Sequence, residues 1–195
     1  MIQAIAGISA AFGLASSAGL NAYIPLLMVA LAARFPLNNP LLNLSEPYDL
    51  IGSWWGIGIL TVLLLIEMTV DKIPAVDTLN DGIQTFIRPA AGAILFAANA
   101  NVITDVHPVL ALAAGLILAG GVHATKVAAR PVVTAVTVGT GNWLVSIVED
   151  VVSFFVSLLS ILLPLFAGLV ALVLVIFAIR LYRQRKKRRN LAFPA

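Results

Sequence analysis

Two pairs of carboxylates stand inside long apolar stretches of this chain, where a charge needs a partner or water. Glu67 and Asp71 are four residues apart and so share one face of a helix, and Glu149 is followed directly by Asp150. Two carboxylates held close together do not both ionise cheaply, so one member of the first pair is expected to hold a proton. Such a pair suits a proton-coupled process, or a cation site built from oxygen ligands. The alternative is that Asp71 only forms an ion pair with a basic neighbour such as Arg88.

A stripe of polar residues surrounds the second pair. Its members recur at three- and four-residue steps, so they share one helical face, and the opposite face is Val, Ile, Leu and Phe. The stripe comprises Asn142, Ser146, Glu149, Asp150, Ser153, Ser157 and Ser160. Such a face either lines a water-filled path or joins helices through hydrogen bonds. Hydroxyls alone favour helix contact, whereas the carboxylates favour a path. The residues expected to line a proton or ion path are therefore Glu67, Asp71, Ser146, Glu149, Asp150 and Ser153.

Three basic side chains follow one another along a second helical face. His123, Lys126 and Arg130 are separated by steps of three and four residues. A buried histidine is a proton carrier near neutral pH, although a lone histidine is often structural. Lys126 and Arg130 are either anchors at a membrane surface or partners of Asp71 and Glu149.

Interrupted helices supply the remaining candidate residues. Asn21 lies between glycine and proline in the segment Ser17–Pro25, and Asn142 follows a glycine turn at 139–141. A glycine turn before a helix exposes N–H groups that suit an anion, although Asn142 also fits a simple helix cap. The residues expected to contact a substrate are Asn21, Arg88, His123, Lys126, Arg130 and Asn142.

The amino-acid composition indicates which kind of structural element holds these residues in place. Hydrophobic residues form 61% of the 195-residue chain and charged residues 11%, with a mean hydropathy of +1.02. Soluble domains carry about a quarter charged residues, so we predict an all-α integral membrane protein. Cysteine is absent, which excludes disulfides and thiolate chemistry.

Six apolar stretches are candidate spans: 4–33, 50–70, 86–104, 108–127, 142–163 and 165–182. We predict a single transmembrane domain over 1–182 and a basic tail over 183–195.

Charge predicts how the chain is oriented. Seven of the twelve basic residues lie between Arg180 and Arg189, beside the last predicted span. Such a run favours the cytoplasmic side and contact with anionic lipid, and no nucleic-acid role is expected. Six spans place both termini on that side, in the inner (plasma) membrane of a bacterium. Trp54 and Trp55 are expected at the opposite surface.

The two longest predicted loops differ in character. Residues 35–49 contain three prolines and are predicted to be irregular. Residues 76–88 place apolar side chains on one helical face and polar ones, including Gln84 and Arg88, on the other. This pattern predicts a short helix lying in the plane of the membrane surface.

An internal repeat is a further prediction. The segment around Asn21 resembles the segment 119–131, because each is an apolar helix with glycine, a polar residue and then proline. The second predicted span of each half also carries an acidic pair, Glu67 with Asp71 and Glu149 with Asp150. Halves over 1–104 and 108–182 would be inverted three-helix repeats with interrupted first helices. A likeness between Arg88-Pro89 and Arg130-Pro131 does not fit this scheme.

Four segments carry a resemblance to a known family: Ser17–Pro25, Glu67–Pro74, Arg88–Gly92, and Gly141-Asn142 with Ser146, Glu149 and Asp150. Over nearly its full length the chain resembles an uncharacterised integral-membrane family of bacteria and photosynthetic eukaryotes, catalogued as a domain of unknown function. The resemblance supports the architecture and implies no activity.

Three functions are compatible with these features. The first is a small transporter or channel for an ion or small polar solute, coupled to protons through the carboxylates. The second is a non-catalytic membrane subunit or assembly factor, in which Gly52 and Gly56 allow close helix packing. The third is an intramembrane enzyme acting on a lipid phosphate through Glu67, Asp71, Arg88 and His123. We favour the transporter, with no cofactor. A homodimer is expected, because few helices are available to enclose a path.

Overall fold

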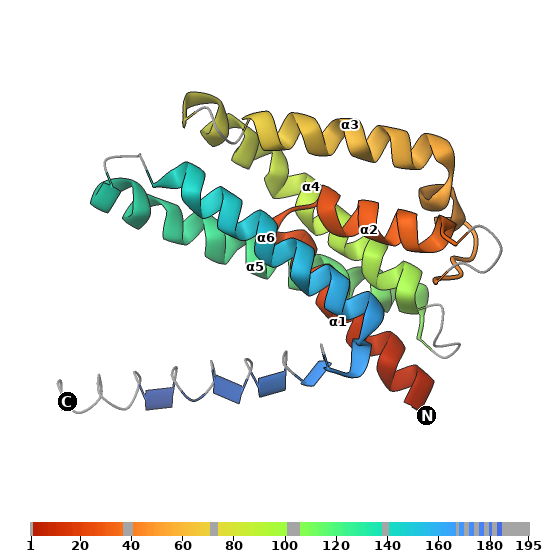
Figure 1. The fold of residues 1–195 in the computed structure, drawn as a ribbon. Coiled ribbons are helices and arrows are strands. Elements are labelled where there is room, and N and C mark those ends of the chain that lie inside the picture. Colours follow the sequence, from red (N-terminus) through yellow and green to blue (C-terminus); the bar gives the residue numbers. More distant parts are fainter. Residues whose placement is uncertain are drawn as a thin grey trace.

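The computed structural model describes residues 2–36, 41–70, 74–100, 106–137 and 141–166, together with parts of 168–184. These residues are helical apart from the connections, which confirms the predicted all-α class (Figure 1). The elements are α1 (Ile2–Leu20), α2 (Tyr23–Arg34), the 3-10 helix η1 (Tyr48–Gly52), α3 (Trp54–Val70), α4 (Pro74–Ala100), α5 (Pro108–Thr137) and α6 (Asn142–Leu162). Asp71, Lys72, residues 139–140 and most of the basic tail 183–195 lie outside the described residues.

Two helices in the described part of the chain, α5 and α6, are long and apolar enough to cross a membrane. The apolar helices Ala4–Leu20, Tyr23–Arg34 and Trp54–Val70 are shorter. The irregular loop predicted over 35–49 is present at 41–45, and it leads into η1.

Helices α1 and α2 form a hairpin, and this corrects the prediction of one span over 4–33. Ser17 contacts Ser153 and Ser157, while Asn21 contacts Asp150, so α1 runs antiparallel to α6. Helix α2 packs against α6 and runs in the same direction (Figure 1). The start of α1 therefore lies at the same end of the bundle as the end of α2 (Figure 1).

The reversal has a local cause at Asn21. This residue leaves the α1 helix, and its side-chain Oδ1 accepts hydrogen bonds from the backbone N–H groups of Tyr23 (2.9 Å) and Ile24 (3.1 Å). These are donors that the first turn of α2 leaves unsatisfied, so the side chain starts a new helix in a new direction. Pro25 is tolerated because it falls in the same first turn.

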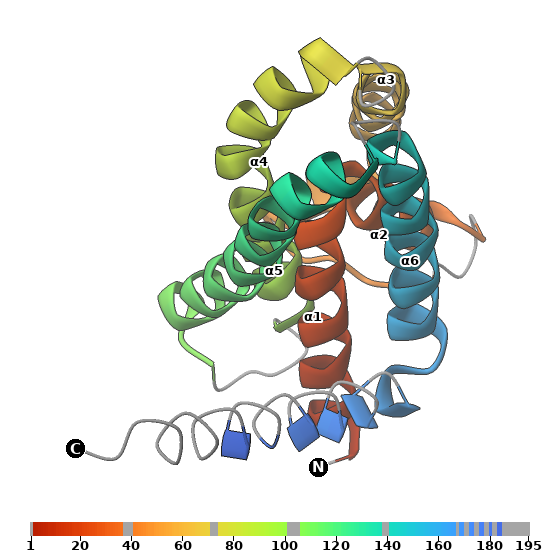
Figure 2. The same cartoon turned by 90° about the vertical axis from the view of Figure 1, so that its left-hand side faces the viewer.

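Two further predictions about helix boundaries are corrected. The interruption expected at Gly120-Gly121 is absent, because α5 continues from Pro108 to Thr137. The Pro89 ring lies beside Gly120, at a distance that would leave an added Cβ in ordinary van der Waals contact. The separate surface helix over 76–88 is also absent, since it forms one helix with the predicted third span. Figure 2 shows that this helix, α4, curves along its length, and Pro89 inside it supplies a cause.

Small residues bring α1, α4 and α5 into close contact at the centre. A Cβ atom added at Gly92 would meet the Ala119 side chain and the Gly115 carbonyl oxygen. One added at Gly19 would meet Val122. Backbones that approach this closely fix the hairpin against α4 and α5. Helix α3 lies at the edge, beside α2 and α4 (Figures 1 and 2).

Candidate functional site: a polar network at the hairpin tip

Polar side chains from four helices, α3 to α6, converge on Asn21, where the α1–α2 hairpin turns. We call this set the polar network: Asn21, Glu67, Gln84, Thr85, Arg88, His123, Lys126, Arg130, Ser146, Glu149 and Asp150. Seven of its members are each at most 6% exposed: Asn21, Glu67, Gln84, Arg88, His123, Lys126 and Ser146. Polar groups buried this deeply need partners within the protein. The network supplies most of them, although Gln84 Oε1 and Arg88 Nε have no hydrogen-bond partner among the described residues.

Glu67 and Arg88 form a buried ion pair between α3 and α4. Arg88 Nη2 lies 3.1 Å from Glu67 Oε1, and both side chains are 1% exposed. The sequence left open whether Arg88 pairs with Asp71, and Glu67 is the partner that the structure shows. A charge pair buried this completely contributes little net stability, because desolvation offsets the Coulomb attraction.

His123 joins this pair to α5. Arg88 Nη1 lies 3.4 Å from His123 Nδ1, and His123 Nε2 lies 3.1 Å from Thr85 Oγ1. A guanidinium group can only donate, so Nδ1 accepts and Nε2 carries the proton that faces Thr85. His123 is therefore an oriented, neutral member of the network.

A second ion pair links α5 to α6. Lys126 Nζ lies 2.7 Å from Glu149 Oε2, with side-chain exposures of 2% and 13%. One turn further along α5, Arg130 Nη2 donates to Ser146 Oγ at 3.2 Å. The basic face predicted over 123–130 thus points into the bundle, and Glu149 is the partner of Lys126.

The hairpin tip itself is held by α6. Asn21 Nδ2 donates to Asp150 Oδ1 at 2.8 Å, while Asn21 Oδ1 caps α2. The two adjacent carboxylates of α6 therefore have different partners, since Glu149 faces Lys126 and Asp150 faces the hairpin. A movement of α6 would act on both contacts.

The hydroxyl part of the α6 stripe joins helices. Ser17 Oγ lies 2.8 Å from Ser153 Oγ and 2.7 Å from Ser157 Oγ, and all three residues are fully buried. This is the helix contact that the sequence offered as an alternative to a path, and it includes Ser153. Asn142 lies at the start of α6, where its side chain and Thr134 on α5 exchange hydrogen bonds.

The family is established by comparison of the whole sequence. The family model described as "Domain of unknown function (DUF4126)" matches residues 8–184. The chain belongs to this family. The resemblance predicted from four short segments is thereby confirmed. No curated protein and no solved structure matches the chain.

Two members of the DUF4126 network, Gln84 and Thr85, were not among the predicted site residues. The sequence placed Gln84 on the outward face of a surface helix, yet it is 2% exposed, while Ile83 and Phe86 are 60% and 79% exposed. The available signal was its position four residues before Arg88, on the same helical face.

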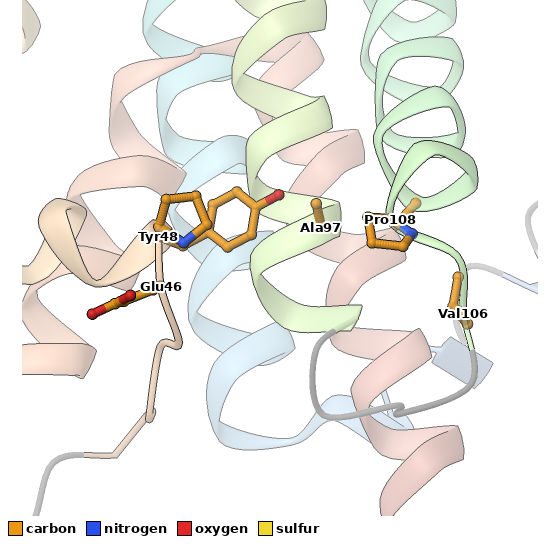
Figure 3. Close-up of a pocket in the computed structure, with 7 residues that line it drawn as sticks. Glu46, Tyr48, Ala97, Val106 and Pro108 are labelled. Carbon is orange, nitrogen blue, oxygen red and sulfur yellow. The ribbon is translucent and has the colours of Figure 1, made fainter.

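A small cavity of about 130 Å³ lies at the opposite end of the bundle. Figure 3 shows the Tyr48 hydroxyl directed toward Ala97 and the Glu46 carboxylate directed away.

Among the described residues, no group of three or more His, Cys, Asp or Glu side chains is arranged to hold a metal ion.

Proposed function

We propose that this DUF4126 protein is an integral membrane protein that moves an ion or a small polar solute across the bilayer through the polar network. The distribution of side chains supports a lipid environment. In α4, Gln84 and Arg88 are buried whereas Ile83 and Phe86 are exposed, and α6 likewise exposes Leu144, Val148 and Phe155. Helices that turn charge inward and large apolar groups outward have lipid as their solvent.

In the proposed arrangement α3, α4, α5, α6 and residues 165–182 cross the bilayer. The α1–α2 hairpin enters from one side, so it replaces the first of the six predicted spans. An inverted repeat would require a matching interruption in α5, and α5 is continuous. The network lies roughly 20 Å along α6 from Leu162, and about 10 Å from its other end, at ~1.5 Å per residue.

Positive charge favours the cytoplasm for the end of the bundle nearer the network, where Arg130 lies and where the basic tail would emerge. The α1–α2 hairpin then enters from the outer side. The N-terminus lies on that side as well, opposite to the basic tail, rather than on the same side as predicted from six spans. This proposal keeps the bacterial plasma membrane as the location and changes only the side on which the N-terminus lies.

One observation carries the functional proposal: two buried ion pairs, Glu67–Arg88 and Glu149–Lys126, meet at the tip of a hairpin that stops inside the bundle. Each pair joins two different helices. A proton or cation that binds Glu149 would release Lys126, and the same exchange at Glu67 would release Arg88 toward His123. Binding at a carboxylate is thereby coupled to the contacts that hold four helices together.

The test is a flux measurement in proteoliposomes, using wild-type protein with imposed proton and cation gradients. We expect flux in the wild type, and a loss of at least about tenfold in Glu67→Gln and in Glu149→Gln, since each change removes an exchangeable charge. Glu46→Gln, the same change on an exposed loop, is the matched control and should keep wild-type flux. An absence of flux from folded wild-type protein would reject the proposal.

The two alternative functions receive no added support from the described residues. Gly52, predicted to allow close helix packing, lies against Ala33 of the same chain, and Gly56 lies against the backbone at Leu50 and Ile51. A folded protein without flux would make the assembly-factor hypothesis the leading one. A homodimer stays a prediction that the oligomeric state in lipid nanodiscs would test.

A further inference from the structure

Helix α3 is bound to the rest of the bundle by different kinds of contact along its length. At its first residue, the Trp54 ring centre lies 4.9 Å from the guanidinium carbon of Arg34 and 5.9 Å from the centre of the Phe35 ring. Further along, Leu60 and Leu63 are partly buried and pack against the core. The first part of α3 is therefore anchored by aromatic and apolar contacts, chiefly to the end of α2.

The end of α3 is held in another way. Glu67 is the one buried residue of this helix, and its carboxylate lies 3.1 Å from Arg88 of α4. The neighbouring Met68 is 38% exposed. The hydroxyl groups of Thr61 and Thr69 donate to backbone carbonyl groups of α3 itself. Toward the end of α3, the buried contact with the bundle is therefore an ion pair.

The Arg88 side of this ion pair is fixed, whereas α3 has room to move. Arg88 is fully buried and lies one turn before Gly92, where the backbone of α4 closely approaches that of α5. Beside α3, a groove of about 460 Å³ lies between this helix, α2 and α6, and its walls are almost entirely apolar. Leu64 and Met68 line it from α3, and Phe154 lines it from α6. An apolar groove can close by helix packing alone, because no polar group loses a partner.

We propose that the Glu67–Arg88 ion pair is a latch, and that breaking it lets α3 pivot about its Trp54 end and close the groove against α6. An ion pair holds two helices together only while both charges are present, so neutralising Glu67 releases this end of α3 from α4. The movement uncovers Arg88, which is a member of the polar network. That it opens the network to a solute rests on the proposed function, whereas the movement itself does not.

The test measures distances between spin labels by double electron–electron resonance, using full-length protein in nanodiscs. The chain contains no cysteine, so labels attach only at introduced ones. The pair Leu65→Cys with Leu144→Cys joins exposed positions on α3 and α6, and the control pair Ile117→Cys with Leu144→Cys joins α5 and α6. In Glu67→Gln we expect the α3–α6 distance to shorten by at least about 2 Å, the scale of helix shifts in switching proteins. The α5–α6 distance should not change.

Glu149→Gln is the matched control variant, because it breaks the other buried ion pair and leaves Glu67 and Arg88 in place. It should leave the α3–α6 distance at its wild-type value. Glu67→Ala combined with Arg88→Ala removes the latch without leaving a buried charge. This double variant should shorten the α3–α6 distance as Glu67→Gln does, and it tests the latch even if Glu67→Gln fails to fold.

An unchanged α3–α6 distance in the latch variants would overturn the inference. An equal change in Glu149→Gln, or in the α5–α6 pair, would also overturn it, because the bundle would then have loosened as a whole. The latch and the proposed transport fail separately. Displacement of α3 in a folded protein without flux would reject the transport and keep the latch. Loss of flux in Glu67→Gln without displacement of α3 would reject the latch and keep the transport.

Discussion

The polar face of α6 has two halves that share one periodicity and differ in chemistry. In one half, Ser153 and Ser157 make short hydrogen bonds to Ser17 and close the contact between α6 and α1. In the other, Ser146, Glu149 and Asp150 contact a guanidinium group, an ammonium group and a side-chain amide on other helices. Periodicity reports which face is buried, and the side-chain type then decides what the buried face does.

The two halves should differ in what their loss affects. Two buried hydroxyl groups form a hydrogen bond at a small desolvation cost. Removing this bond lowers the free energy of unfolding and leaves the charge of the bundle unchanged. A buried ion pair adds little stability while intact, yet it leaves an uncompensated charge when one partner is removed. We therefore expect loss of a hydroxyl contact to lower stability alone, and loss of one charged partner to lower both stability and flux.

The largest effect on stability should come from breaking one ion pair on one side. Arg88→Leu leaves the Glu67 carboxylate buried without its cation, which is expected to lower the free energy of unfolding by about 3–5 kcal/mol. Unfolding in mixed micelles with increasing dodecyl sulfate would measure it. The double variant Glu67→Leu with Arg88→Leu should recover most of the loss, and equal losses in both would contradict a buried pair.

A smaller loss is expected from the close contact at the centre. Gly92→Ala would place a methyl group against Ala119 and the backbone of Gly115, and such overpacking costs about 1–3 kcal/mol. Gly121→Ala, on α5 where a Cβ meets nothing within 4 Å, is the matched control. The same unfolding assay applies, and equal stability of the two variants would show that the backbones are not in contact.

The smallest effect should come from the hydroxyl half. Ser157→Ala removes the contact with Ser17 and is expected to lower the free energy of unfolding by about 0.6–1.7 kcal/mol. Ser160→Ala is the control, because within the described part of the chain the Ser160 hydroxyl bonds only to Val156 of its own helix. If Ser160→Ala is as destabilising as Ser157→Ala, the hydrogen bond to α1 contributes no more to stability than a hydrogen bond within α6.

Much of the fold was readable from the sequence, and the failures have identifiable causes. Apolar stretches predicted the helices, and the glycine–asparagine–proline pattern at residues 19–25 predicted an interruption. Pattern alone does not give the direction in which a chain leaves an interruption, so the hairpin was missed. The same pattern near Gly120 was misleading, since α5 continues through it without an interruption.

The candidate site was predicted in its residue types and less well in its pairings. Glu67, Arg88, His123, Lys126, Glu149 and Asp150 were singled out because charge inside apolar helices needs a partner. The Lys126–Glu149 pair was anticipated as one alternative, whereas Glu67–Arg88 was not. Pairing depends on which helices are neighbours in space, and a single sequence does not show directly which helices these are.

The central claim is that the charged half of α6 serves transport, whereas its hydroxyl half contributes only to stability. The most direct measurement compares Glu149→Gln with Ser157→Ala, recording proteoliposome flux and unfolding free energy for both. We expect Glu149→Gln to lose flux by at least about tenfold per folded protein, and to lower stability as well, because it leaves Lys126 buried without its carboxylate. We expect Ser157→Ala to lose stability and keep flux once folded protein is counted. Equal flux in wild type and Glu149→Gln, or equal flux loss in both variants, would contradict the account.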